Sequence, residues 1–127
     1  MNVVDSSGWL EYFEGGQNAN FFAPAIQDLE HLIVPAICIY EVFKRVLMQR
    51  NEQDALRAVG VMSLGAVVNV DRQLAINAAQ ISLASKLAMA DSLILATARA
   101  HQATLWTQDE HFIGLDDVKF TPKISDL

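Results

Sequence analysis

Cysteine is almost absent from this sequence, since Cys38 is the only one in 127 residues. A lone cysteine excludes an intrachain disulfide and is typical of a reducing compartment, so we expect the protein to act in the cytoplasm. The sequence also has no cluster of cysteine and histidine residues, which excludes a structural zinc site built from them.

Basic residues are scarce as well. There are 9 Lys and Arg against 15 Asp and Glu, and the formal net charge is -6. This balance argues against nonspecific coating of nucleic acid, so any nucleic-acid binding must come from a local basic patch and be sensitive to salt. The first basic residue is Lys44, so we expect no signal peptide with a cationic start.

Long hydrophobic runs are missing too. The stretch from Ala58 to Val70 carries no charge, but it is shorter than the ~20 residues that a membrane-spanning helix needs, so we expect no membrane segment. The chain is 52% hydrophobic over 127 residues, enough for one core but too short for two. We therefore predict a single domain covering residues 1–127.

What the sequence does contain is an alternation of extended and helical patterns. Short apolar runs predict strands, and segments with apolar residues at helical spacing predict helices between them. This alternation is typical of a parallel sheet with helices on both faces. We predict an α/β fold, a three-layer α/β/α domain with a central, mostly parallel sheet of about five strands. The expected strands are Asn2–Asp5, His31–Val34, Ala66–Val70, Ala103–Thr107 and Val118–Phe120, and the expected helices run from Ser6 to Gly15, Asn18 to Leu29, Pro35 to Arg50, Asn51 to Met62, Asp71 to Leu83 and Met89 to His101.

Two acids stand out in the stretch from Lys86 to Asp109. At about 100° per residue, Asp91 shares a helical stripe with Ile94 and Leu95, on the face that should meet a core. A carboxylate there is costly to bury unless a helix N-terminus or a bound cation compensates it. Asp109 follows the next strand, although it could equally cap the short helical turn after it. A strand end and a helix start meet at one sheet edge, where ligands bind in open α/β folds, so these acids indicate a site.

Two further acids are candidates for the same edge. Asp5 ends the first strand and can be read either as the cap of the next helix or as a site residue. Glu41 lies among apolar residues in the helix after Pro35. It is either buried with a partner or exposed opposite the apolar stripe, and the pattern leaves both possibilities open. We expect Asp116 and Asp117, in the loop before the last strand, to be solvated.

If these four acids converge, four negative charges share a small volume with no Lys or Arg beside them in sequence. Their repulsion would raise pKa values and destabilise the fold. A hard divalent cation removes the problem, because carboxylate oxygens suit Mg²⁺ or Mn²⁺. Such a centre activates water and neutralises charge on phosphate oxygens, which indicates phosphoester hydrolysis with one or two ions.

The four acids lie in segments that read VVDSSGWLEYF at the start, VPAICIYEVFKRVL in the middle, LAMADSLILATARA, and TLWTQDEHF late in the chain. These segments resemble the acidic motifs of PIN-domain ribonucleases, and specifically of the VapC-type toxins of bacterial toxin-antitoxin pairs. The resemblance spans essentially the whole chain, and it is carried by the order of the four motifs rather than by any one of them. Trp106 is bulkier than the aliphatic residue expected at its position.

The resemblance implies a PIN-like fold and a role for each motif residue. Ser7 matches the hydroxyl two residues after the first acid, and Thr107 matches the hydroxyl shortly before the last. The resemblance also implies a homodimer, and a small VapB-like antitoxin whose C-terminal segment lies across the active-site groove. The RNA substrate could be a tRNA or an rRNA. The residues that would hold Mg²⁺ or Mn²⁺ for RNA cleavage are Asp5, Glu41, Asp91 and Asp109.

Alternative functions stay open at this point. The chain could be an RNA-processing nuclease with no antitoxin, or a module that binds RNA or protein with inert acids. A phosphoacceptor receiver domain has a similar size, but it needs an acidic pair where Asp5 is followed by Ser6. A haloacid-dehalogenase-like phosphatase needs a second Asp where Ser7 stands, which excludes it.

The remaining polar and aromatic residues have plainer interpretations. We expect His111, beside Asp109, to be a solvated surface residue rather than a general base, and His31 and His101 to lie on the surface. The large aromatics near the N-terminus should build the core or a protein interface. Basic residues on the helices could contact RNA phosphates or simply face solvent. The candidate contacts are Lys44, Arg45, Lys86 and Arg99, with Arg50 and Arg57 on the same helical hairpin as the first two.

Overall fold

The computed structural model describes residues 1–124 and contains one five-stranded sheet. The strands are β1 (Asn2–Val4), β2 (Leu32–Pro35), β3 (Ala66–Val68), β4 (Thr104–Thr107) and β5 (Val118–Phe120). They lie in the order β3-β2-β1-β4-β5, and every neighbouring pair runs parallel. The predicted α/β class is confirmed, and the sheet is parallel throughout.

The central strand, β1, is where the strand order changes direction. The chain steps outwards from β1 to β2 and β3, and then crosses back to β4 and on to β5. Asn2 pairs in register with Leu32 on one side and with Thr104 on the other. In open α/β sheets the loops after the central strands separate at such a switch point and leave a crevice at the carboxyl edge. The residues that follow β1 and β4 therefore border this crevice.

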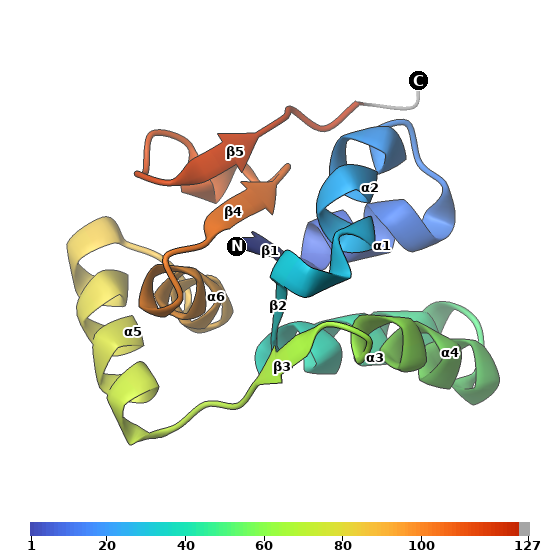
Figure 1. Cartoon of the computed structure of the whole chain (residues 1–127), viewed down its shortest axis with the longest axis horizontal. Helices are drawn as coiled ribbons and strands as arrows, with labels where there is room; N and C mark the ends of the chain where they lie inside the picture. Colours follow the sequence, from blue (N-terminus) through green and yellow to red (C-terminus); the bar gives the residue numbers. More distant parts are fainter. Residues whose placement is uncertain (125–127) are drawn as a thin grey trace.

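Helices cover both faces of the sheet, as the three-layer prediction requires. They are α1 (Ser6–Glu14), α2 (Ala19–Gln27), α3 (Ala36–Gln49), α4 (Glu52–Met62), α5 (Arg72–Ser85) and α6 (Met89–Ala100), with short 3₁₀ turns η1 (Leu29–His31) and η2 (Glu110–Phe112). In Figure 1, α1 and α2 lie on one side of the strands and α5 and α6 on the other. The hairpin of α3 and α4 lies beside β2 and β3.

Side-chain caps mark where α1, α4 and α5 begin. Asp5 accepts a hydrogen bond from the backbone N–H of Gly8 at the start of α1, and Asp71 accepts one from Leu74 at the start of α5. These bonds satisfy backbone donors that have no partner within the helix. The first helix ends at Gly15, whose φ of 64° is a left-handed conformation that favours glycine. Asp5 thus joins the end of β1 to the first turn of α1.

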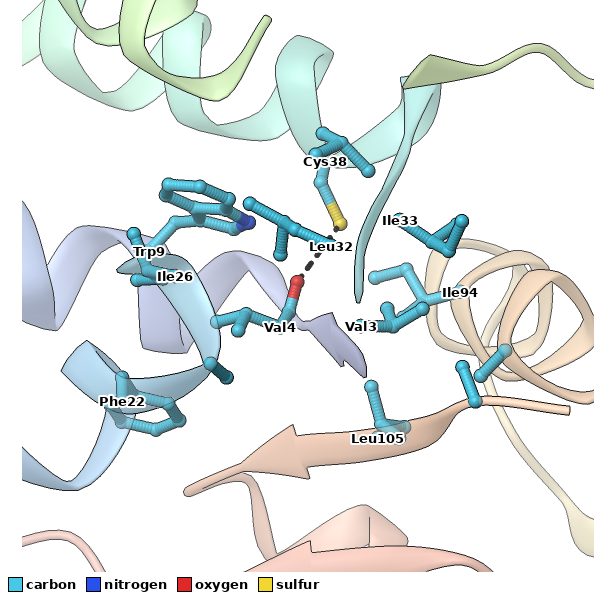
Figure 2. Packing of buried hydrophobic residues seen from close by; sticks show 14 of the residues in the cluster. Val3, Val4, Trp9, Phe22, Ile26, Leu32, Ile33, Cys38, Ile94 and Leu105 are labelled. Atoms are coloured by element: carbon cyan, nitrogen blue, oxygen red, sulfur yellow. Dashed lines mark hydrogen bonds between the residues drawn. The ribbon is translucent and has the colours of Figure 1, made fainter. Parts of the chain in front are cut away.

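The hydrophobic core lies on both faces of β1. Val3 and Val4 are completely buried, and successive strand residues face opposite sides of the sheet. Figure 2 shows Ile94 of α6 near Val3, and Trp9 of α1 on the side of Val4. Ile94 and Leu95 each expose only 1% of their surface, so the predicted apolar stripe of α6 does meet the core.

Several element boundaries differ from the sequence prediction. His31, expected to begin the second strand, belongs to η1, because both its backbone N–H and its ring contact Asp28. Pro35, expected in the first turn of a helix, is the last residue of β2. Pro35 pairs with Val68, which is the last residue of β3. The third strand therefore ends two residues before the predicted end at Val70. The helix α2 and the strand β4 are also slightly shorter than predicted.

No single helix within residues 1–124 is long and apolar enough to cross a membrane. The helices α5 and α6 meet that criterion of length and composition only as a pair, and the chain bends by 115° between them.

Candidate active site

An open pocket of about 540 Å³ lies at the carboxyl edge of the sheet. All four acids singled out from the sequence line it. Asp5 follows β1, Asp109 follows β4, Asp91 lies in the first turn of α6, and Glu41 projects from α3. The other lining residues are Ser6, Ser7, Leu10, Tyr40, Lys44, Arg45, Met48 and Ile94.

Asp5 is deeply enclosed, with 3% of its surface exposed. Its Oδ1 accepts hydrogen bonds from the backbone N–H of Gly8 and from the hydroxyl of Ser7, both at 2.8 Å. Its Oδ2 accepts one from the hydroxyl of Thr107 at 2.5 Å. The same hydroxyl oxygen of Thr107 accepts the backbone N–H of Asp109 at 2.9 Å. The two hydroxyls predicted as supporting residues therefore hold Asp5 in place, and Thr107 links it to the segment of Asp109.

The close fit of α1 against β1 depends on a glycine at position 8. A Cβ atom at Gly8 would lie 2.6 Å from the ring of Phe22 and 2.6 Å from Val4, and both of those side chains are completely buried. Any side chain would push the helix away from the strand, because a packed interior has little room to move. Gly8 thus allows its own N–H to reach Asp5.

Glu41 is half-buried, so it lies between the buried and the exposed positions that the sequence left open. Its Oε1 accepts a hydrogen bond from the hydroxyl of Ser6 at 2.7 Å. The neighbouring Tyr40 is 58% exposed, so the first turns of α3 are open to solvent on this side. This contact between Ser6 and Glu41 is a feature that the sequence did not predict.

Asp91 and Asp109 lie on the solvent side of the pocket together with a histidine. The Nδ1 of His111 lies 3.3 Å from Oδ2 of Asp91 and 3.2 Å from Oδ1 of Asp109. The side chain of His111 is 71% exposed, as expected for a surface residue. The sequence did not predict its contacts with the two acids. Its only signal in the sequence was its place two residues after Asp109.

Burial and mutual repulsion change the proton affinity of two of these acids. Burial raises the pKa of Asp5 to about 6, from an ordinary value of 3.8, although hydrogen bonds, above all that from Thr107, oppose the rise. The charge on Asp109 adds to it. Burial also raises the pKa of Asp91, the charge on Asp109 raises it further, and His111 lowers it. The predicted repulsion among the acids is therefore present.

The fold itself does not neutralise these carboxylates with a lysine or an arginine. Within residues 1–124, no Lys or Arg nitrogen lies within 4.0 Å of any of the four, although Lys44 and Arg45 line the pocket. Carboxylate oxygens with an open side to water suit a hard divalent cation. Asp91, Asp109 and His111 can each offer one ligand atom, and these three atoms lie within 4.8 Å of one another. The residues present fit Mg²⁺ or Mn²⁺.

Cys38 lies beneath the pocket but is not available to it. Its side chain is completely buried, and its Sγ points to the backbone carbonyl oxygen of Val4 at 3.8 Å, as Figure 2 shows. Burial raises the pKa of the thiol. The thiol therefore stays protonated and is neither a nucleophile nor a metal ligand.

The four predicted RNA-contact residues fall into two pairs. Lys44 and Arg45 are among the residues lining the pocket, whereas Lys86 and Arg99 are not. Lys86 is the left-handed residue that ends α5, with a φ of 55°. Arg99 lies in the last turn of α6, about 12 Å along the helix from Asp91 at 1.5 Å per residue.

Gln108 is a supporting residue that sequence reasoning missed. It is 5% exposed, its Nε2 donates to Glu11 at 3.0 Å, and its Oε1 accepts from Asn18 at 3.0 Å. These bonds tie the segment after β4 to α1 and to the start of α2. Its only sequence signal was its position between Thr107 and Asp109.

A parallel sheet with acids gathered at its switch point defines an α/β domain with an acidic candidate metal site. The sequence profile of the PIN domain family matches residues 3–118, which is most of the chain, so this protein belongs to the PIN domain family. The predicted family is thereby confirmed. No curated protein sequence matches the chain significantly.

Solved structures with the same fold come from several bacteria. A chain of a toxin-antitoxin complex from Klebsiella pneumoniae has a TM-score of 0.77 and 24% identity, with 94% of this chain and 96% of that chain covered. FitAcB from Neisseria gonorrhoeae has a TM-score of 0.75 and 24% identity, with the same coverage of 94% and 96%. VapC20 from Mycobacterium tuberculosis, described as a Sarcin-Ricin loop cleaving toxin, has a TM-score of 0.68 and 14% identity, with 82% and 85% covered. At these identities the likeness shows the fold.

Proposed function

We propose that this protein is an endoribonuclease that depends on Mg²⁺ or Mn²⁺ and acts in the cytoplasm as the toxin of a VapBC-type toxin-antitoxin pair. The observation that carries the proposal is the meeting of Asp5, Glu41, Asp91 and Asp109 at one open pocket on the switch point of the sheet. Membership of the PIN domain family supports a nuclease. Similar structures described as a toxin-antitoxin complex and as a Sarcin-Ricin loop cleaving toxin support the biological role.

In this proposal the four acids divide two tasks between them. Asp5, Asp91 and Asp109 hold the cation, and Glu41 orients a water molecule from α3. A divalent cation held there would neutralise charge on the phosphate oxygens and would promote ionisation of water. The three hydrogen bonds to Asp5 keep its carboxylate from rotating away, and the Ser6 hydroxyl does the same for Glu41. Preorganised groups of this kind need no rearrangement during the reaction.

The reaction is a hydrolysis of an RNA phosphodiester. Water attacks phosphorus in line with the departing 3′ oxygen, and the bond from phosphorus to that oxygen breaks. The departing oxygen takes a proton and becomes a 3′-hydroxyl, and the new phosphorus–oxygen bond leaves a 5′-phosphate. Glu41 accepts a hydrogen bond from the attacking water and holds it on the face opposite the departing group.

The rim of the pocket supports a single-stranded or looped RNA substrate. Lys44 and Arg45 are exposed on α3 and supply positive charge for phosphates beside the acids. Tyr40 exposes 58% of its surface in the same pocket, where its ring can stack on an unpaired base. Lys86 and Arg99 lie outside the pocket and would contact only RNA that extends beyond it.

Two apolar surfaces support the proposed protein partners. One groove is formed by α1, α3 and α4 and adjoins the acidic pocket through Leu10, which suits an antitoxin segment that continues across the site. On the other side of the domain, Leu83 is 86% exposed and Met89 is 72% exposed, beside a hollow of about 550 Å³. Exposed apolar patches mark interaction sites, and this one would pair with a second copy of the chain.

Cleavage of a labelled RNA by the purified full-length protein tests the proposal. We expect cleavage of single-stranded RNA with Mg²⁺ or Mn²⁺, no cleavage in EDTA, and products with a 5′-phosphate. Asp91→Asn should lower kcat/KM at least about a thousandfold, which is about 4 kcal/mol of transition-state stabilisation. The matched control is Asp116→Asn, which changes an exposed acid outside the pocket and should cleave like the wild type.

Each of the other possible outcomes would contradict a different part of the proposed function. Cleavage that continues in EDTA rejects the metal mechanism. Metal-dependent cleavage without growth arrest on expression indicates an RNA-processing nuclease with no antitoxin. Tight RNA binding without cleavage in any metal indicates the inert binding module.

A further inference from the structure

His111 does not line the acidic pocket, but its side chain contacts two of the acids that do, a role that the sequence did not assign to it. Its Nδ1 lies 3.3 Å from Oδ2 of Asp91 and 3.2 Å from Oδ1 of Asp109, so the imidazole bridges the two acids on the solvent side. It approaches them from η2, whereas Asp91 belongs to α6. Three ligand atoms from two separate elements thus face one another.

The backbone holds His111 in this position. Asp109 caps η2, and its Oδ1 accepts the backbone N–H of His111 at 3.0 Å. The next residue, Phe112, is completely buried and anchors the turn to the core. The His111 side chain itself is 71% exposed, so core packing does not place it there. Contacts with the two carboxylates, rather than packing against the core, therefore orient the imidazole.

The spacing of the three atoms matches a shared cation. Adjacent ligands of an octahedral ion with bonds of about 2.1 Å are separated by √2 times that length, or about 3.0 Å. The two distances from Nδ1 exceed this edge by a few tenths of an ångström. The three ligand atoms all lie within 4.8 Å of one another, so small side-chain adjustments bring them around one ion.

We propose that His111 supplies a nitrogen ligand to the cation held between Asp91 and Asp109, and that this nitrogen makes the site prefer Mn²⁺ to Mg²⁺. Imidazole suits the transition metals, whereas Mg²⁺ favours oxygen ligands and water. A site of carboxylates alone would lack this preference. The inference rests on the cation site of the proposed function, but not on RNA as the substrate.

The competing explanation is that His111 only forms an ion pair with the two acids and swings away when a cation binds. The cation would then have oxygen ligands alone. The two explanations differ in what the bound ion touches, so a spectroscopic measurement on the bound ion separates them.

The experiment uses the full-length protein, stripped with EDTA and then loaded with Mn²⁺. Electron spin echo modulation of the bound Mn²⁺ reports directly bonded nitrogen, and labelling histidine with ¹⁵N identifies its source. We expect a histidine nitrogen coupling in the wild type and none in His111→Gln. The variant should weaken Mn²⁺ binding at least about tenfold. It should weaken Mg²⁺ binding, measured by competition with Mn²⁺, by about twofold or less.

A matched control is His101→Gln. His101 lies just past the end of α6, and its Nδ1 lies 3.0 Å from the backbone carbonyl oxygen of Thr97. The His101→Gln variant should keep both the histidine nitrogen coupling and the Mn²⁺ affinity. His111→Ala provides a second test, because an exposed position tolerates the change, and circular dichroism checks that it folds. A wild-type spectrum without nitrogen, or unchanged Mn²⁺ affinity in both His111 variants, overturns the proposal.

Failure of this inference and failure of the proposed function look different. A protein that binds Mn²⁺ through histidine but cleaves no RNA supports the ligand and rejects the nuclease. A protein that cleaves RNA with Mn²⁺ but shows only oxygen ligands rejects the ligand and keeps the nuclease.

Discussion

Asp5 and Asp109 follow adjacent parallel strands and face the same pocket, yet their burial and their hydrogen bonding differ. Asp5 is 3% exposed and accepts three hydrogen bonds from Ser7, Gly8 and Thr107. Asp109 has a side chain that is 27% exposed, and its carboxylate accepts the N–H of the residue two positions on. One half of the site is thus built into the core, and the other half is built on its surface.

This difference assigns the two halves to different tasks. Three donors hold the Asp5 carboxylate in position, while its burial disfavours ionisation and raises its pKa to about 6 in spite of those hydrogen bonds. The outer half is exposed enough to admit water, a cation and RNA, and it includes His111. We expect changes to the inner half to act strongly on folding stability, and changes to the outer half to act on binding.

The largest effect on stability should come from Gly8→Ala. Its Cβ would lie 2.6 Å from Phe22 and from Val4, neither of which can move without disturbing the core. Overpacking of this kind costs about 1–3 kcal/mol or more of unfolding free energy, measurable by urea denaturation. The matched change is Gly60→Ala in α4, where a Cβ meets nothing within 4 Å. It should stabilise the protein by roughly 0.5–1 kcal/mol, and equal effects of the two changes would contradict this account of the inner half.

Asp5→Asn should abolish RNA cleavage and yet make the metal-free protein more stable at about pH 8. The folded-state pKa of Asp5, about 6, lies above the ordinary value of 3.8, so the folded protein binds more protons between these two values. The unfolding free energy therefore falls as pH rises through this window, and the ionised acid costs at most about 3 kcal/mol above it. An asparagine removes that cost because it stays neutral. Urea denaturation of the variant at acid and alkaline pH checks this, and a variant less stable than the wild type at alkaline pH would reject it.

A smaller effect is expected from Tyr40, on the outer rim. Loss of one base stacked on its ring costs about 1–3 kcal/mol of RNA binding energy. Tyr40→Ala should weaken binding of a single-stranded RNA to the Asp91→Asn protein, while Tyr40→Phe keeps it, as fluorescence anisotropy can measure. Leu47→Ala serves as the control, because Leu47 is also exposed on α3, at 44%, but does not line the pocket. An equal loss of RNA affinity in Tyr40→Phe would rule out stacking of a base on the ring, because phenylalanine keeps the ring.

The smallest effect should come from Ser6→Ala, which removes the hydrogen bond to Glu41. A bond from a neutral donor to a charged acceptor contributes about 1.5–3 kcal/mol at most, and water can replace part of it at a half-exposed site. We expect a fall in kcat of roughly tenfold with little change in KM, because Ser6 positions Glu41 rather than touching RNA. An unchanged kcat would show that Glu41 needs no such support.

The order of the elements could be predicted from the sequence because each depends on local patterns. Apolar spacing placed α6, and cap residues such as Asp71 and Gly15 marked where helices begin and end. The positions of Asp5 and Asp109 on one sheet edge followed from their places after strands, and that of Asp91 followed from its place at the start of a helix. The short 3₁₀ turn at His31 was missed, because it depends on contacts of its backbone and its ring with Asp28 rather than on an apolar pattern.

The finer contacts of the site could not be predicted in the same way. The bond between Ser6 and Glu41, and the approach of His111 to Asp91, join residues distant in the chain whose side chains meet only after the helices pack. Gln108 likewise gains its role from α1 and α2. Sequence spacing gives the face on which a residue lies, but not the partner that reaches it from another element.

The most direct test of the central claim is the unfolding free energy of the full-length wild type, measured by urea denaturation from about pH 5 to about pH 8, with and without Mg²⁺. Without metal we predict that stability falls as pH rises, because burial raises the pKa of Asp5 to about 6 and its ionised form is costly to hold in the folded protein. Burial, and then the charge on Asp109, raise the pKa of Asp91 as well, which acts in the same direction. Saturating Mg²⁺ should restore at least about 1 kcal/mol at the alkaline end and less at the acid end, where Asp5 holds a proton instead. A stability that Mg²⁺ leaves unchanged at every pH would contradict the claim that a divalent cation compensates these acids.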